Sequence, residues 1–153
     1  MKILLATTIL FILFSCVSSK ISMLEDKYCK LGSLTFQEIT DTIHQVKNGS
    51  VEGGVKANGK IIVSDKISLD TVGAYLNAGK KVFIDEKTLR TVKVSQDFYE
   101  KYTANRKALC DIIGGIKAKV ISTDEGKKRA ETIYLDLVSM FGGLSSNDEK
   151  KNQ

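Results

Sequence analysis

The sequence predicts an α+β fold: an amphipathic helix, a small sheet of about four mostly antiparallel strands with a short helix between them, and a C-terminal antiparallel helical hairpin. Two observations carry this prediction. Asn58-Gly59, the favoured two-residue turn of a β-hairpin, separates two short runs of strand-forming residues. In the last third of the chain, apolar residues recur at steps of three and four, which is typical of amphipathic helices.

Residues 36–47 are expected to form the first helix. Thr35 and Glu38 have the spacing of a capping box, in which each side chain satisfies a backbone N–H of the other. Asn48-Gly49 supplies a left-handed stop at the end of the segment. The apolar stripe of this helix consists of Phe36, Ile39, Ile43 and Val46.

The sheet is expected to follow this helix. Residues 55–57 and 60–64 flank the Asn-Gly turn, and two further strands are expected at 81–85 and about 89–94. A short helix over 69–78 fits between the two pairs, with Ser68 before it and Gly79 after it.

Two long helices complete the predicted fold, the first beginning after Ser95. Their recurring residues are Phe98, Tyr102, Asn105, Leu109, Ile112 and Ile116 in the first helix, and Gly126, Ala130, Ile133, Leu137, Met140 and Leu144 in the second. Helices with matching seams and a short connection pack antiparallel. The small residues Gly126 and Ala130 are then expected to face Ile116 and Ile112.

The N-terminus has the order of a secretory signal. A short basic start, Met1-Lys2, precedes an apolar run from Ile3 to Phe14, which is too short for a transmembrane helix of about 20 residues. Ser15-Cys16 follows directly, and this start resembles a bacterial lipoprotein signal. The resemblance implies that Cys16 is lipidated and becomes the first residue of the mature chain. A second interpretation is conventional cleavage after Ser19, which would release the protein freely.

These features predict the domain organisation. Residues 1–15 are a signal peptide, 16–33 the lipidated cysteine and a polar tether, 34–144 a single α+β domain, and 145–153 a disordered polar tail. The mature chain of about 135 residues is large enough to bury a core.

The two cysteines that follow the signal, Cys29 and Cys110, form an even pair in an oxidising compartment, which predicts a disulfide. It would close a loop of about 80 residues and contribute roughly 4 kcal/mol in the chain-entropy model. The alternative is two free thiols, with Cys110 packed as a small apolar group.

The sequence contains no motif for a metal, a cofactor or a catalytic nucleophile. His44 is the single histidine, no Gly-x-Ser-x-Gly elbow is present, and the clustered glycines match no phosphate loop. No catalytic residue is therefore nominated, no cofactor is expected, and the mild net charge of +5 predicts no nucleic-acid partner.

One basic cluster flanks the turn between the last two helices and is a candidate anion-binding site. It consists of Lys117, Lys119, Lys127, Lys128 and Arg129. The alternative is that these residues are a solvated helix tip.

We expect an exported, lipid-anchored and non-catalytic binding module of a bacterial envelope, held on the periplasmic or outer surface, whose partner is an envelope protein or an acidic glycan. One alternative is a freely secreted inhibitor or immunity-type protein. Another is an envelope hydrolase that uses two carboxylates. The carboxylates near predicted strand ends are Asp65, Asp70, Asp85, Glu86 and Asp97.

Overall fold

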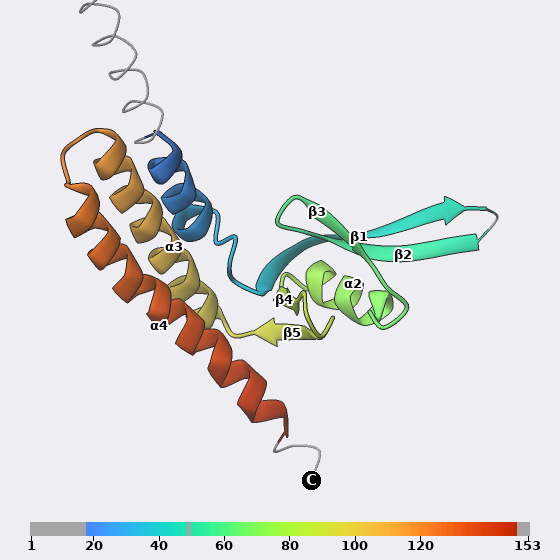
Figure 1. Ribbon diagram of the computed structural model, residues 1–153. Coiled ribbons are helices and arrows are strands. Elements are labelled where there is room, and N and C mark those ends of the chain that lie inside the picture. Colours follow the sequence, from blue (N-terminus) through green and yellow to red (C-terminus); the bar gives the residue numbers. More distant parts are fainter. Residues whose placement is uncertain (1–17, 49, 150–153) are drawn as a thin grey trace, which may run out of the picture. The chain divides into compact units, whose positions relative to one another are not determined.

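The computed structural model describes residues 18–48 and 50–149 (Figure 1). They form one five-stranded antiparallel sheet and several helices, of which the last two pack as a hairpin. The predicted α+β class is therefore confirmed. Backbone contacts divide the chain into two compact units. Of the described residues, the first unit comprises 18–33 and 103–137, and the second unit comprises the others.

The second unit contains the sheet, whose strands are arranged in the order β3-β2-β1-β4-β5. The strands are β1 (Phe36–Lys47), β2 (Ser50–Ala57), β3 (Lys60–Val63), β4 (Lys81–Asp85) and β5 (Thr91–Val94). The first residues of β1 pair with β4 and the rest pair with β2, with a register shift between Ile39 and Asp41. Because such an irregularity bends a strand and increases its twist, the long β1 can serve both halves of the sheet.

The prediction of a helix over 36–47 is wrong, because these residues form β1. Phe36 and Ile39 are three positions apart, so their side chains lie on opposite faces of the strand. Both are nevertheless buried. Both faces of this end of β1 are therefore covered, and the apolar residues do not alternate with polar ones. Glu38 makes no capping box, since its Oε1 accepts a hydrogen bond from the Tyr99 hydroxyl at 3.0 Å.

Asparagine and glycine make the turns of the sheet. Asn58 and Gly59 join β2 to β3 with φ values of 48° and 75°, the left-handed conformation that the predicted turn requires. Asn48, with φ of 52°, lies between β1 and β2, so this pair connects two strands instead of ending a helix. Its partner Gly49 lies outside the described residues.

Helix α2 (Leu69–Asn77) covers one face of the sheet, close to its predicted position. Val72 of α2 is fully buried in a cluster with Ile39, Val55 and Val82, among others. A Cβ added to Gly53 of β2 would lie 1.9 Å from Leu69 Cδ1. Glycine at this position therefore permits the close approach of helix and strand.

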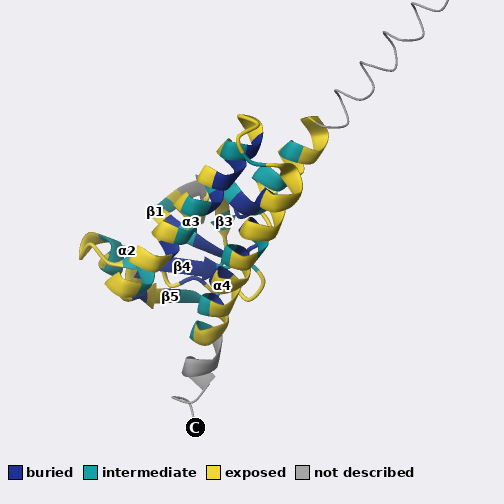
Figure 2. Ribbon diagram, turned by 90° about the vertical axis from the view of Figure 1, so that its left-hand side faces the viewer, coloured by how far each residue is buried: buried dark blue, intermediate teal, exposed yellow. Residues whose placement is uncertain are grey.

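The opposite face of the sheet is covered by aromatic side chains. Phe83 of the buried strand β4 (Figure 2) lies between Tyr102 and Phe141, with ring centroids 5.0 and 5.2 Å away. Phe36 stacks on Phe141 at 5.0 Å. Such pairs add to the free energy gained from burial by about 1 kcal/mol each. They fix the start of α3 and the end of α4 within this unit.

The first unit begins with a folded segment where we expected a tether. Residues 18–24 are helical, and one π-helical turn, η1 (Glu25–Cys29), follows. Tyr28 is completely buried and Leu31 is 3% exposed. The described part of the expected tether is therefore packed into the fold, because its apolar side chains have a hydrophobic surface to bury against.

Helices α3 (Gln96–Lys117) and α4 (Thr123–Glu149) contribute to both units and confirm the predicted hairpin. In the first unit their buried seam consists of Leu109, Ile112, Ile116, Ala130 and Leu137. A Cβ added to Gly126 would lie 2.5 Å from Ile116 Cδ1, as the predicted pairing of small with large residues requires. Helix α4 continues beyond its expected end at Leu144, into the segment predicted as a tail, and residues 150–153 lie outside the described ranges.

Candidate functional site

The carboxylates considered for a hydrolase have local roles or lie in solvent. Asp85 accepts hydrogen bonds from the Lys87 backbone N–H at 3.1 Å and the Thr88 hydroxyl at 2.9 Å, so it stabilises the β4–β5 turn. Glu86 Oε1 lies 3.8 Å from Lys60 Nζ. The remaining three, Asp65, Asp70 and Asp97, have exposed side chains. None of the five lines any of the grooves described below.

Metal ligation finds no support in the described part of the chain. It contains no group of three or more histidine, cysteine, aspartate or glutamate side chains that could hold a metal ion. His44 is exposed on β1, opposite Gly53 of β2.

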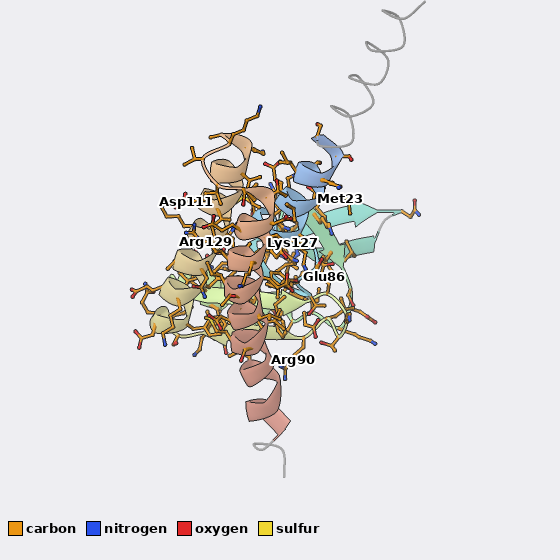
Figure 3. All side chains as sticks on the ribbon, turned by 60° about the vertical axis from the view of Figure 1, so that its left-hand side comes forward. Met23, Glu86, Arg90, Asp111, Lys127 and Arg129 are labelled. Carbon is orange, nitrogen blue, oxygen red and sulfur yellow. A yellow bond between two sulfur atoms is a disulfide. The ribbon has the colours of Figure 1, made fainter. Side chains whose placement is uncertain are left out.

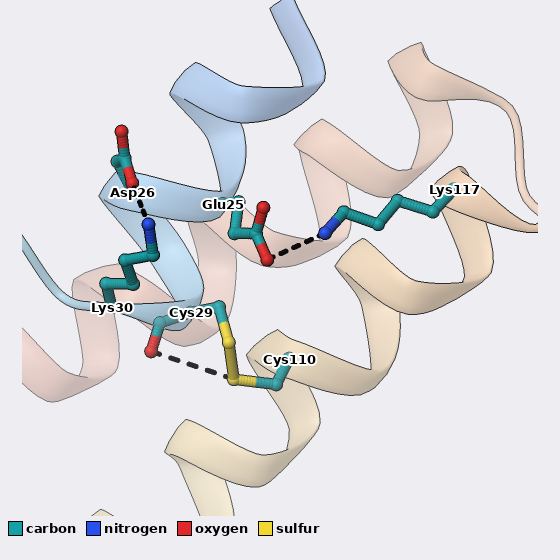
Figure 4. The surroundings of a disulfide bond; sticks show 6 residues. All are labelled: Glu25, Asp26, Cys29, Lys30, Cys110 and Lys117. Carbon is teal, nitrogen blue, oxygen red and sulfur yellow. Dashed lines mark hydrogen bonds and ion pairs between the residues drawn. A yellow bond between two sulfur atoms is a disulfide. The ribbon is translucent and has the colours of Figure 1, made fainter. Parts of the chain in front are cut away.

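The predicted disulfide is present between Cys29 and Cys110, whose Cα atoms are 4.6 Å apart (Figure 4). It joins the π-helical turn to the middle of α3. The Cys110 sulfur lies 3.6 Å from the Cys29 carbonyl oxygen, but an oxidised sulfur has no proton to donate. Beside the disulfide, Lys117 Nζ forms an ion pair with Glu25 at 2.7 Å.

A hydrogen-bonded cluster holds the same segment against α4. The buried Tyr28 hydroxyl and Lys27 Nζ both donate to Oε2 of Glu131, the latter at 3.0 Å. The Tyr28 ring also meets Tyr134 edge to face, with centroids 5.6 Å apart. The phenol of Tyr28 and the ammonium group of Lys27 both stabilise the charged carboxylate of Glu131. The pKa of Glu131 is therefore lowered.

The pKa values of the two donors of this cluster, Tyr28 and Lys27, are raised. Burial raises the pKa of Tyr28, and its hydrogen bond to Glu131 adds to the rise. The hydrogen bond to Glu131 also raises the pKa of Lys27. The cluster therefore holds its protons on Tyr28 and Lys27, which suits a structural clamp better than an acid–base pair working near neutral pH.

A groove runs along the first unit between the N-terminal segment and the start of α4. Two adjoining depressions of about 470 and 590 Å³ form it and share Met23, Leu24 and Lys127. Met23 and Lys127 are labelled in Figure 3. The first depression is also lined by Lys20 and Asp124. This groove is open to solvent and contains apolar walls with charged side chains at its rim.

A second groove, of about 330 Å³, lies on the helical hairpin. Its apolar lining consists of Ala108, Ile112, Ile121 and Ile133, from α3, the following turn and α4. Asp111 and Arg129 complete the lining with opposite charges (Figure 3). An apolar floor with a few charged groups is typical of a surface that binds another molecule.

The five residues of the predicted anion-binding site do not form one common site in the structure. Lys117 is paired with Glu25, and Arg129 lies 3.8 Å from Glu125. Lys119, Lys127 and Lys128 are exposed, and the described interactions include no ion pair for them. Lys127 borders the N-terminal groove and Arg129 borders the hairpin groove, so the five cations do not line one common pocket.

The N-terminal groove and the clamp around Tyr28 were not predicted, because a tether was expected over this segment. The segment nevertheless contains an apolar spacing that predicts a helix. Ile21, Leu24, Tyr28 and Leu31 recur at steps of three, four and three. That spacing places apolar side chains on one face of a helical segment.

The predicted lipidation site, Cys16, and the leader before it lie outside the described residues. Between residues 18 and 149, apart from position 49, no helix is long and apolar enough to cross a bilayer. A scan of protein-family models, a search of curated proteins and a search of solved structures each found no match to this chain.

Proposed function

We propose that this protein is an exported, lipid-anchored and non-catalytic binding module of a bacterial cell envelope. The observation that carries the binding function is the hairpin groove, in which four apolar residues form a continuous lining with one carboxylate and one guanidinium beside them. Glycosidase-type hydrolysis needs two carboxylates flanking one bond. The hairpin groove contains one carboxylate, Asp111. The N-terminal groove contains two, Asp124 and Asp26, but they line different depressions and Asp26 is paired with Lys30 at 2.7 Å.

The groove suits a segment of an envelope protein that presents an aliphatic side chain. Ile121 and Ile133 are partly exposed there, while Ile112 is 5% exposed and forms the floor. Burial of one leucine-sized side chain contributes about 1.5–3 kcal/mol. Asp111 and Arg129 can orient the partner, although both are engaged by exposed neighbours on their own helices.

The anchoring part of the proposal rests on the leader and Cys16. Fractionation of cells that express the tagged full-length chain tests it. We expect the wild type in the membrane fraction, labelled by radioactive palmitate, and Cys16→Ser without label and released from membranes. Ser18→Ala is the matched control and should behave as wild type. Membrane association of Cys16→Ser equal to that of the wild type would remove the lipid anchor.

The binding part is tested by cross-linking in envelope extracts with two variants of α3. Ala108 lines the groove, whereas Ala104 is exposed one turn earlier and does not line it. Ala108→Lys should lose a cross-linked partner that both the wild type and Ala104→Lys retain. Identical cross-linked products for the two lysine variants would contradict binding at this groove, and hydrolysis of an envelope polymer by the purified protein would contradict a non-catalytic role.

A further inference from the structure

We infer that one end of the first unit, here called the basic tip, rests on an anionic lipid surface. The basic tip consists of Lys20, Met23, Lys119, Val120, Lys127 and Lys128. This inference rests on the proposed anchoring at Cys16 and adds a second, non-covalent contact with the same membrane.

The six residues belong to one end of the unit. Lys20, Met23 and Lys127 line a common depression. Lys119 and Val120 belong to the short connection between α3 and α4, and Lys117, the last residue of α3, reaches Glu25 at 2.7 Å. The α3–α4 connection and the N-terminal segment are therefore neighbours, tied by the ion pair shown in Figure 4.

Covalent geometry places this end near the proposed anchor. Cys16 precedes Ser18 by two positions, and two residues of chain span at most about 7 Å. The described helix begins at Ser18, and Lys20 and Met23 follow within it. A lipid on Cys16 would therefore hold this end of the unit against the headgroups.

The charge of the basic tip suits anionic headgroups. Among the described residues, Lys20, Lys119, Lys127 and Lys128 have exposed side chains and form no described ion pair. Two carboxylates lie near Lys127: Asp124 lines the same depression, and Glu131 interacts with it electrostatically. The four lysines outnumber these two carboxylates. The other basic residues of this end, Lys117 and Arg129, are paired with glutamates. Lysines next to a membrane anchor are attracted by the negative surface potential of anionic lipids.

The backbone of the connection turns an aliphatic side chain outward. Lys119 has a φ of 58°, and its N–H donates to the Ile116 carbonyl while the Val120 N–H donates to the Gly115 carbonyl. This pattern is a Schellman motif, in which the residue at the position of Val120 usually packs back on the helix. Here that helix position is Gly115, and a Cβ added to it would lie 2.6 Å from Ile121 Cδ1.

Ile121 therefore occupies the space beside Gly115, and Val120 is left 81% exposed. Met23 is 71% exposed. Of the exposed large apolar side chains in the described ranges, these two have the highest exposed fractions, and both belong to the basic tip. Apolar side chains surrounded by lysines are the combination that inserts shallowly into an anionic lipid interface.

A single tryptophan can report this contact, because the chain contains none. The full-length Val120→Trp protein, purified from membranes in detergent, is reconstituted with vesicles of phosphatidylglycerol and phosphatidylcholine, or of phosphatidylcholine alone. On the anionic vesicles we expect a blue-shifted emission and quenching by lipids brominated in their acyl chains. Both effects should weaken at 1 M salt, where the Debye length falls to about 3 Å.

Two controls test the assignment. Leu135→Trp places the reporter within the same unit, at a residue of α4 that is 56% exposed and lies 12 positions, or about 18 Å of helix, after Thr123, and its emission should not depend on the lipid. Adding Lys119→Glu and Lys127→Glu to Val120→Trp should abolish the shift, while circular dichroism shows an unchanged helix content.

The outcomes separate this inference from the proposed anchoring. If the protein floats with both kinds of vesicle and the emission of Val120→Trp is the same on both, the lipid contact of the basic tip is refuted. Equal shifts for Val120→Trp and Leu135→Trp would also refute it, because they would indicate nonspecific adsorption of the unit. Failure of the anchoring itself would appear in the cell fractionation of Cys16→Ser, which does not involve the tryptophan reporter.

Discussion

Removal of the disulfide should destabilise the first unit by several kcal/mol. Cys29 and Cys110 are separated by 81 residues. In the chain-entropy model, closing a loop of this length stabilises the folded state by about 4.5 kcal/mol at 25 °C, within the range of about 2–5 kcal/mol that follows the loss of native disulfides. Cys110→Ser also frees the segment that carries the buried Tyr28, so the loss should be greatest for contacts of residues 18–33.

Urea unfolding followed by circular dichroism measures this loss. Cys110→Ser and Cys29→Ser should unfold at the same, lower urea concentration, and the wild type in a reducing agent should match them. Oxidised wild type and Cys110→Ser that differ by no more than about 0.5 kcal/mol, the size of an ordinary surface substitution, would refute the reasoning. Two alkylatable thiols at Cys29 and Cys110 in the folded protein, isolated without a reducing agent, would do so as well.

Four further predictions concern the hairpin and the clamp. Leu109→Ala removes a fully buried side chain and should cost about 2–5 kcal/mol in urea unfolding; a near-zero loss would mean that the helical seam is misassigned. Gly126→Ala should cost about 1–3 kcal/mol by overpacking, while Gly114→Ala, with open space around the new methyl group, should gain about 0.5–1 kcal/mol; equal effects would contradict the packing. Because the folded pKa of Glu131 is lowered, its stabilisation is present above about pH 4.3 and lost as the pH falls through the folded pKa. Glu131→Gln should therefore flatten the acid limb of stability against pH. The pKa of Tyr28 is raised by burial and by its hydrogen bond to Glu131, so its stabilisation is lost as the pH rises above about 10. Tyr28→Phe should reduce this alkaline limb, and an unchanged limb would mean that the Tyr28 hydroxyl is not buried.

The elements set by local signals could be predicted from the sequence. The Asn58-Gly59 turn follows from the backbone conformations that these two residues tolerate, and the helical hairpin follows from a long, regular periodicity. The pairing of Gly126 with Ile116 was also predictable, because matched seams leave few alternative registers.

The local signals of residues 36–47 were divided between a helix and a strand. Thr35 and Glu38 match a capping box, but β1 is fixed by distant pairing with β2 and β4. The β-branched residues of 36–47 favoured a strand, and so did the Asn-Gly pair that follows them. The competing strand signal was therefore present, and long-range pairing decided between the two. Because residues 36–47 form a strand, the sheet has five strands instead of the predicted number of about four.

The candidate sites were harder to predict, because grooves arise where segments distant in the sequence meet. The hairpin groove needs Ala108 and Ile133 side by side, and the N-terminal groove needs Met23 beside Lys127. The disulfide was an exception. Once Cys16 is assigned to the proposed lipid anchor, two cysteines remain, and an even number of thiols in a chain expected to be exported predicts a bond without any knowledge of the fold.

The proposed lipid anchor is tested by the intact mass of the protein recovered from the membrane fraction. We predict a polypeptide that begins at Cys16 and carries acyl chains on that residue. A full-length 153-residue chain dissolved in the cytosol, or an unmodified chain that begins at Lys20, would contradict it.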